Sequence, residues 1–165
     1  MITEQEIQKF EAFISKLPLE HNRSSNEFGY DNPVLLCLDA VLSMNRKYDS
    51  FVVPRIHLFV ESYPEINRLE KLHDLIQRLG HDGFCEAWNY KHVERVQILE
   101  RLCTRLMEIT QTQNAPTEIA ALKQWARSAR PHDYQEFGVK GIGLATFQYI
   151  RMMLGAEFLV IMWSG

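Results

Sequence analysis

The chain lacks the features that mark membrane-spanning, secreted and metal-binding proteins. It has no run of roughly 18 uninterrupted apolar residues, and its N-terminus has no succession of basic, apolar and small residues, so neither a membrane span nor a signal peptide is predicted. Its cysteines are odd in number, far apart and without the spacing of a zinc site: Cys37, Cys85 and Cys103. We therefore expect a cytoplasmic protein without a metal ion, in which the cysteines of apolar helical runs are core residues.

Excess positive charge is also lacking. The 165 residues carry a net charge of −3, which is not typical of a protein held to nucleic acid by bulk electrostatics. The charge is unevenly distributed, however, because residues 121–165 have five basic and three acidic side chains, a net charge of +2, which leaves −5 for residues 1–120. A solvated basic surface produces such an asymmetry by chance, so it is weak support for a nucleic-acid partner.

What the sequence does contain is helical periodicity along most of its length. With 46% hydrophobic and 24% charged residues, the chain is long enough to bury one sizeable core. No segment has a convincing period of two, so we predict an all-α fold of about eight to ten helices and no sheet. Thr3 and Glu6 form a predicted capping box, and Gly80 is predicted to end a helix. The expected helices cover residues 4–16, 34–45, 54–62, 66–79, 93–109, 117–128 and 143–154.

Two glycines flank a single aliphatic residue towards the C-terminal end of the sequence. Gly141 and Gly143 have no Cβ atom and can take positive φ, so the chain can reverse tightly there while Ile142 turns inward. The amides that follow lie at the start of a predicted helix, where unsatisfied N–H donors and the positive end of the helix dipole favour an anion. The pattern predicts a hairpin that can bind a phosphate group, although Gly-x-Gly also occurs in ordinary turns.

The hairpin resembles the helix-hairpin-helix of the HhH-GPD superfamily of base-excision DNA glycosylases. That motif usually reads Leu-Pro-Gly-aliphatic-Gly, then any residue, then Lys or another residue, then Thr-Ala. The corresponding positions here are, in order, Val139, Lys140, Gly141, Ile142, Gly143, Leu144, Ala145, Thr146 and Phe147. The resemblance implies an all-helical, glycosylase-like bundle that contacts the backbone of duplex DNA through Lys140, Gly141, Ile142, Gly143, Leu144 and Ala145.

A second resemblance to this superfamily lies in residues 32–45, which match an early core helix that typically ends in Leu-Ser-x-Gln. The segment from Val34 to about Asn45 is apolar nearly all round and is predicted to be the buried centre of the fold. Asn45 stands where the superfamily has a glutamine that enters the duplex when the damaged nucleotide is extruded. Asparagine also commonly ends a helix, so both interpretations stay open. The charged residue of this helix, Asp39, is either a candidate acid, a cap for a neighbouring helix or a partner for an arginine.

The residues that perform catalysis in this superfamily are missing from their expected places. A carboxylate is needed to stabilise the positive charge that develops on the sugar. The resemblance implies an aspartate past the hairpin, at a place that corresponds here to Met162, Trp163 or Ser164, and Glu157 follows the hairpin too closely. Ala145 takes the place of the lysine nucleophile of bifunctional members. We therefore expect a chain that stops before the catalytic aspartate and has no catalytic residue.

These observations predict a single HhH-GPD-like helical domain over residues 1–165. It has an N-terminal helix and loop in residues 1–30 and a helical core in residues 31–155, which holds the helix-hairpin-helix at about residues 130–154. We expect a monomer that binds the phosphate backbone of duplex DNA, with no membrane partner and no cofactor. An iron–sulfur cluster is excluded because no cysteine follows Cys103. Two alternatives stay open: a protein-interaction module on the same scaffold, and an active glycosylase that uses another carboxylate.

Overall fold

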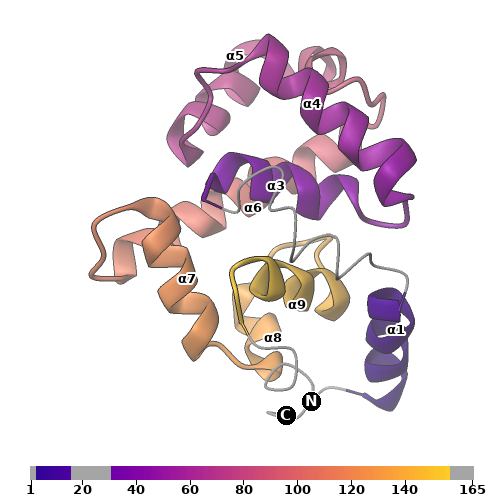
Figure 1. The fold of residues 1–165 in the computed structure, drawn as a ribbon, viewed down its shortest axis with the longest axis vertical. Coiled ribbons are helices and arrows are strands. Elements are labelled where there is room, and N and C mark those ends of the chain that lie inside the picture. The colour runs from indigo at the N-terminus through magenta and orange to yellow at the C-terminus, as the bar shows by residue number, and fades with distance from the viewer. Residues whose placement is uncertain (1–2, 16–30, 157–165) are drawn as a thin grey trace.

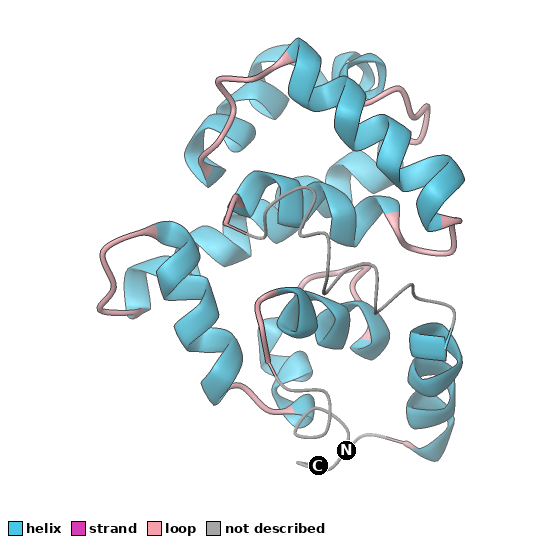
Figure 2. Cartoon of the chain, viewed as in Figure 1, coloured by secondary structure: helices cyan, strands magenta, loops and turns pink. Residues whose placement is uncertain are grey.

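The computed structural model of this chain describes residues 3–15 and 31–156, and every regular element in these ranges is helical (Figure 2). No strand occurs in the described part, so the predicted all-α class is confirmed. None of the described helices is both long enough and apolar enough to cross a bilayer. In chain order the elements are α1 (Glu4–Ser15), α3 (Pro33–Leu42), the π-helix η1 (Tyr48–Val52), α4 (Val53–Ser62), α5 (Leu69–Ala87), α6 (Val93–Thr112), α7 (Glu118–Ser128), the 3-10 helix η2 (Pro131–Asp133), α8 (Tyr134–Phe137) and α9 (Leu144–Met153).

Local signals in the sequence set several of the helix ends. Before α1, Oγ1 of Thr3 accepts a hydrogen bond from the Glu6 amide at 3.2 Å, and Oε2 of Glu6 accepts one from the Thr3 amide at 2.8 Å, which is the predicted capping box. Pro54 lies in the first turn of α4, where its missing N–H costs least. Gly80 has φ 73° and ψ 167°, so it interrupts α5 at the predicted place, although helical residues resume beyond it.

α3 is the buried centre of the fold, as its apolar sequence predicts. All ten of its residues are buried, and the helix packs against α4, α5, α6 and α9. Burial on all sides is expected for a helix that has no polar stripe. α3 ends at Leu42, and Ser43 is its C-cap residue, so the helix is shorter than the predicted one, which ran to Asn45.

The helices form two groups in Figure 1, with α3, α4, α5 and α6 in one and α1, α8 and α9 in the other. α6 packs against α5 and α3 in the first group, α1 packs against α9 in the second, and α7 contacts both α6 and α9. The hydroxyl of Tyr134 donates to the carboxylate of Glu6 at 2.8 Å and so links α8 to α1. Helices from the two ends of the described chain therefore support the segment between α8 and α9.

A cluster of aromatic rings holds the short helix α8 against α7 and α9. The ring centroid of Phe137 lies 5.6 Å from that of Trp125 and 5.2 Å from that of Phe147. Phe147 is completely buried, and Trp125 meets it edge to face at 5.9 Å. A helix of four residues does not persist in water by itself, so this packing positions the start of the following turn.

Candidate functional site

The segment between α8 and α9, residues 138–143, forms the predicted hairpin. Gly138 ends α8 at φ 64°, and the amide of Ile142 donates to the carbonyl of Val139 at 3.0 Å across the turn. Val139 and Ile142 are buried and belong to the main core cluster. Ile142 therefore turns inward as predicted and fixes the hairpin to the body of the protein.

The two glycines of the predicted motif have different roles. Gly141 has φ 99°, a value that L side chains rarely adopt, and a Cβ atom there would lie 2.6 Å from Cδ1 of Ile98 on α6. Gly143 has φ −90° and ψ −177°, and a Cβ atom there would meet nothing within 4 Å. The expectation that both glycines use positive φ is therefore wrong for Gly143. Contact with α6 requires glycine at position 141, whereas position 143 faces open space.

The N-terminus of α9 is the part of the hairpin that can bind a ligand. Gly143 is its N-cap residue, and no side chain among the described residues caps the helix. The first amides of an α-helix have no intrahelical acceptor, and the helix dipole adds partial positive charge there. Lys140 and Gly143 are exposed, Ala145 is half-buried, and Leu144 is buried beneath the turn. Backbone N–H groups and one exposed lysine thus lie together, an arrangement that can bind an anion.

Asn45 lies in the turn after α3. It is exposed and has φ 59°, the left-handed conformation in which asparagine commonly ends a helical segment. α6 connects this turn with the hairpin. Arg46, next to Asn45, donates to the hydroxyl of Tyr90, and Tyr90 packs against His92 at the start of α6. Further along the helix, Ile98 contacts Gly141. The interval from residue 92 to residue 98 corresponds to about 9 Å of helix.

Two arginines and two aromatic rings form a cluster that includes Arg46, the residue after Asn45. The guanidinium of Arg55 lies 3.7 Å from the centroid of the Phe51 ring, and that of Arg46 lies 5.5 Å from it. The rings of Phe51 and Tyr90 meet edge to face at 4.9 Å, and Arg46 donates to the Tyr90 hydroxyl at 3.1 Å. The sequence carried no signal for this cluster, because the Arg46–Tyr90 contact joins residues 44 positions apart.

Asp39 is buried in the contact between α3 and α9. Its Oδ1 accepts hydrogen bonds from the hydroxyls of Tyr149 at 2.5 Å and Ser43 at 2.8 Å, and its Oδ2 accepts one from Tyr48 at 3.3 Å. Burial raises the pKa of Asp39 to about 6, and the hydrogen bonds partly offset this effect. Its side-chain partners among the described residues are hydroxyl groups, not the arginine or helix end that the sequence suggested. At 1% exposure, the carboxyl group is closed to a substrate and ties two helices together.

The positive charge of the C-terminal third is less concentrated at the hairpin than the sequence indicated. Arg151 of α9 is completely buried, and its guanidinium donates to the Ala126 carbonyl at 3.3 Å and to the Gln148 side chain at 2.8 Å. Burial lowers the pKa of Arg151 to about 10, so it stays charged at neutral pH. Lys123 pairs with Asp31 at 3.0 Å. Arg151 is therefore closed to a partner of the hairpin, and Lys123 already has an acidic partner.

The described part of the chain has no group of three or more His, Cys, Asp and Glu residues that could hold a metal ion. All three cysteines are buried and form no disulfide, so those of the apolar helical runs are core residues as predicted, and the third is buried as well. Burial raises the pKa of Cys103 to about 12 and also raises that of Cys37, which keeps both groups as unreactive thiols at neutral pH.

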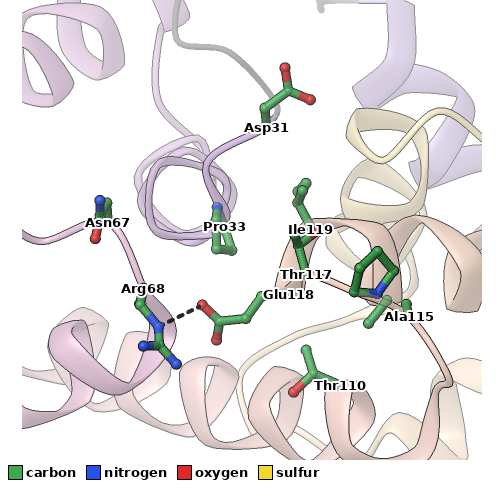
Figure 3. A pocket seen from close by; sticks show the side chains of 11 residues that line it. Asp31, Pro33, Asn67, Arg68, Thr110, Ala115, Thr117, Glu118 and Ile119 are labelled. Atoms are coloured by element: carbon green, nitrogen blue, oxygen red, sulfur yellow. Dashed lines mark ion pairs between the residues drawn. The ribbon is translucent and has the colours of Figure 1, made fainter.

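A cleft of about 550 Å³ lies where the N-termini of α3, α5 and α7 approach one another (Figure 3). Asn32 caps α3 and Thr117 caps α7 through their side chains. Oε1 of Glu118 accepts from the first amide of α5 at 3.3 Å and lies 3.9 Å from Nε of Arg68, the ion pair drawn in Figure 3. The protein's own oxygen atoms therefore occupy these helix ends, and no residue of the hairpin lines the cleft.

The hairpin and the cleft are thus two candidate sites in the described part of the chain, and at the hairpin no described side chain caps the helix end. Neither a family model, nor a curated protein, nor a solved structure matches this chain. The geometry and charge of the hairpin are therefore the basis on which a function is inferred.

Proposed function

We propose that this protein binds the phosphate backbone of duplex DNA through its hairpin, as the HhH-GPD glycosylases that its sequence resembles do. The observation that carries the proposal is the N-terminus of α9. No described side chain caps it, and Gly141 and the buried Ile142 hold it in position. Phosphate groups bind readily at such a terminus because N–H donors and the helix dipole act together. Lys140 adds an exposed positive charge at the same place.

Binding through this site is expected to be weak and largely independent of DNA sequence. The amides of residues 143–145 and the side chain of Lys140 would contact phosphates, which carry no sequence information. A net charge of −3 gives the protein no long-range attraction to DNA. The exposed side chain of Asn45 is proposed to contact the duplex from the turn after α3.

The proposal is for DNA binding without the covalent chemistry of the superfamily. Ala145 takes the place of the lysine nucleophile, so no Schiff base with an abasic sugar can form at that position. Asp39 is closed to substrate by burial, and Glu157 lies outside the described residues. Incubation with duplexes that contain uracil, 8-oxoguanine or alkylated adenine, followed by alkali, is expected to leave the strands intact. A duplex with an abasic site, incubated without alkali, is also expected to stay intact. Strand cleavage that depends on Glu157 or Asp39 would instead identify an enzyme with a different carboxylate.

The variant Gly143→Val tests the hairpin as the binding site. Valine is compatible with the extended backbone at this position, and nothing lies within 4 Å of the added Cβ atom. As a poor N-cap it should cost about 1 kcal/mol of stability or less, because glycine itself is only a moderate cap. Its branched side chain would cover the first amides of α9. Since a hydrogen bond to a charged group is worth about 1.5–3 kcal/mol, duplex affinity should fall by at least about tenfold.

Fluorescence anisotropy of a labelled duplex measures the affinity, and thermal unfolding followed by circular dichroism verifies the fold. Ser62→Val is the matched control, because Ser62 is an exposed residue at the end of α4, in the other group of helices (Figure 1). It should bind like the unaltered protein. Unchanged duplex binding by folded Gly143→Val would show that the hairpin is not the site. A protein-interaction module would show no salt-dependent duplex binding at all.

A further inference from the structure

Arg101 of α6 contacts the hairpin from outside the motif. Its Nη1 atom donates to the backbone carbonyl of Lys140 at 3.3 Å, and the side chains of both residues are exposed. The two residues are 39 positions apart in the sequence. The fold therefore brings a second cationic side chain to the surface at which Lys140 lies.

The position of Arg101 is fixed by the packing beneath it. Ile98, one helical turn earlier on α6, is buried against Gly141, where the absence of a Cβ atom permits close approach. Residues three apart on an α-helix lie on the same side of it, so Arg101 follows Ile98 along the surface that faces the hairpin. The contact between Arg101 and Lys140 is thus a consequence of how α6 supports the turn.

The charges of Arg101 and Lys140 are not neutralised by any residue that the structure describes. Within the described residues neither side chain forms an ion pair, whereas Arg105, one turn further along α6, pairs with Glu108 at 3.0 Å. Glu100, the neighbour of Arg101, is engaged by His81 of α5. A guanidinium has five N–H donors, and the Lys140 carbonyl accepts from one nitrogen, so donors are left for a ligand.

We infer that Arg101 is a second phosphate-binding residue of the hairpin site and contacts the DNA backbone beside the phosphate held by α9. This inference rests on the proposed function. A guanidinium suits the role because its planar fork can donate two parallel hydrogen bonds to one phosphate group. The site then consists of backbone amides from α9, an ammonium group from the turn and a guanidinium from α6.

The test is the salt dependence of duplex binding by Arg101→Gln. Glutamine keeps a polar amide with N–H donors but carries no charge. Each lost phosphate contact should reduce the slope of log K against log salt concentration by about 0.9, and at low salt the affinity should fall several-fold. Arg101→Lys should retain the slope because it keeps the charge. Arg78→Gln, which removes an exposed arginine from α5, should bind like the unaltered protein.

A slope that is the same for Arg101→Gln and the unaltered protein would overturn the inference. If the slope is unchanged but the affinity is lower, Arg101 only positions the Lys140 backbone. If both the slope and the affinity are unchanged, Arg101 takes no part in duplex binding. Either result leaves the proposed function intact, provided that Gly143→Val weakens binding. Absence of any salt-dependent duplex binding by the unaltered protein would overturn both proposals.

Discussion

The N-termini of α3, α5 and α7 border one cleft, whereas the N-terminus of α9 follows the hairpin. At the cleft, Asn32, Thr117 and Glu118 supply oxygen acceptors to the three helix ends. At the hairpin, Gly143 has no side chain to offer. Both regions have the partial positive charge of a helix end, but among the described residues an anionic or polar side-chain partner is found in the first region and not in the second.

This difference separates residues that stabilise the protein from residues expected to bind a ligand. A side chain that caps a helix contributes to the free energy of unfolding and leaves nothing for a partner. A helix end without a cap loses that contribution and keeps its donors. The two regions are joined through Asp39, because α3 begins at the cleft, α9 begins at the hairpin, and the Asp39–Tyr149 hydrogen bond links the two helices.

The largest effect on stability is expected at this junction, from Asp39→Asn. The pKa of Asp39 is about 6 in the folded protein against 3.8 as its ordinary value. As the pH rises between these values, the unfolded chain ionises first and the folded state loses stability. Because one pKa unit corresponds to about 1.4 kcal/mol, this loss amounts to at most about 3 kcal/mol. Asparagine does not titrate, so the variant does not lose stability in this way.

Urea unfolding of both proteins between about pH 4 and about pH 7 measures this effect. The stability of Asp39→Asn relative to the unaltered protein should rise across the interval, while duplex binding at neutral pH stays the same. Other carboxyl groups titrate in both proteins, so their contributions cancel in the difference. A difference in stability that does not vary with pH would contradict the account of Asp39.

A smaller effect is expected from Gly141→Ala, which tests the support of the hairpin. Alanine at φ 99° is strained, and its methyl group would lie 2.6 Å from Ile98. Strain of this kind costs about 1–3 kcal/mol. Both the free energy of unfolding and the duplex affinity should fall, because the turn and the N-terminus of α9 would move. Gly143→Ala is the matched comparison, with a loss of stability below about 1 kcal/mol; equal losses for the two variants would contradict the different roles of the glycines.

The smallest effect is expected at the cleft, from Thr117→Ala. This change removes the side chain that accepts from the Ala120 amide at 3.1 Å and so caps α7. It should lower the free energy of unfolding by about 1 kcal/mol and leave duplex binding unchanged. Weaker duplex binding by this variant would show that the cleft, rather than the hairpin alone, takes part in recognition.

Periodicity and capping residues were enough to predict most helices. The Thr3–Glu6 box, Pro54 and Gly80 each determine the backbone conformation of residues close to them in the sequence. Their effects can therefore be predicted without knowledge of the tertiary structure. Periodicity predicted neither the π-helix η1 nor the four-residue α8, because neither is long enough to show a period, and a helix before the hairpin was implied by the resemblance alone. Packing against other helices determines both.

The hairpin could be predicted in part, since the inward turn of Ile142 follows from its two neighbouring glycines. The conformations of Gly141 and Gly143 could not be told apart, because what distinguishes them is the approach of Ile98 from α6. The contacts of Arg101 with Lys140 and of Tyr149 with Asp39 likewise depend on tertiary packing between residues 39 and 110 positions apart.

The salt dependence of duplex binding by the unaltered protein tests the central claim most directly. Affinities for two short duplexes of unrelated sequence would be measured between about 50 and about 200 mM salt. If Lys140 and Arg101 each contact a phosphate, log K should fall linearly with log salt concentration with a slope of about −2, equally for both duplexes. Affinity that does not change with salt, or no binding at the lowest salt concentration, would contradict a phosphate-binding hairpin.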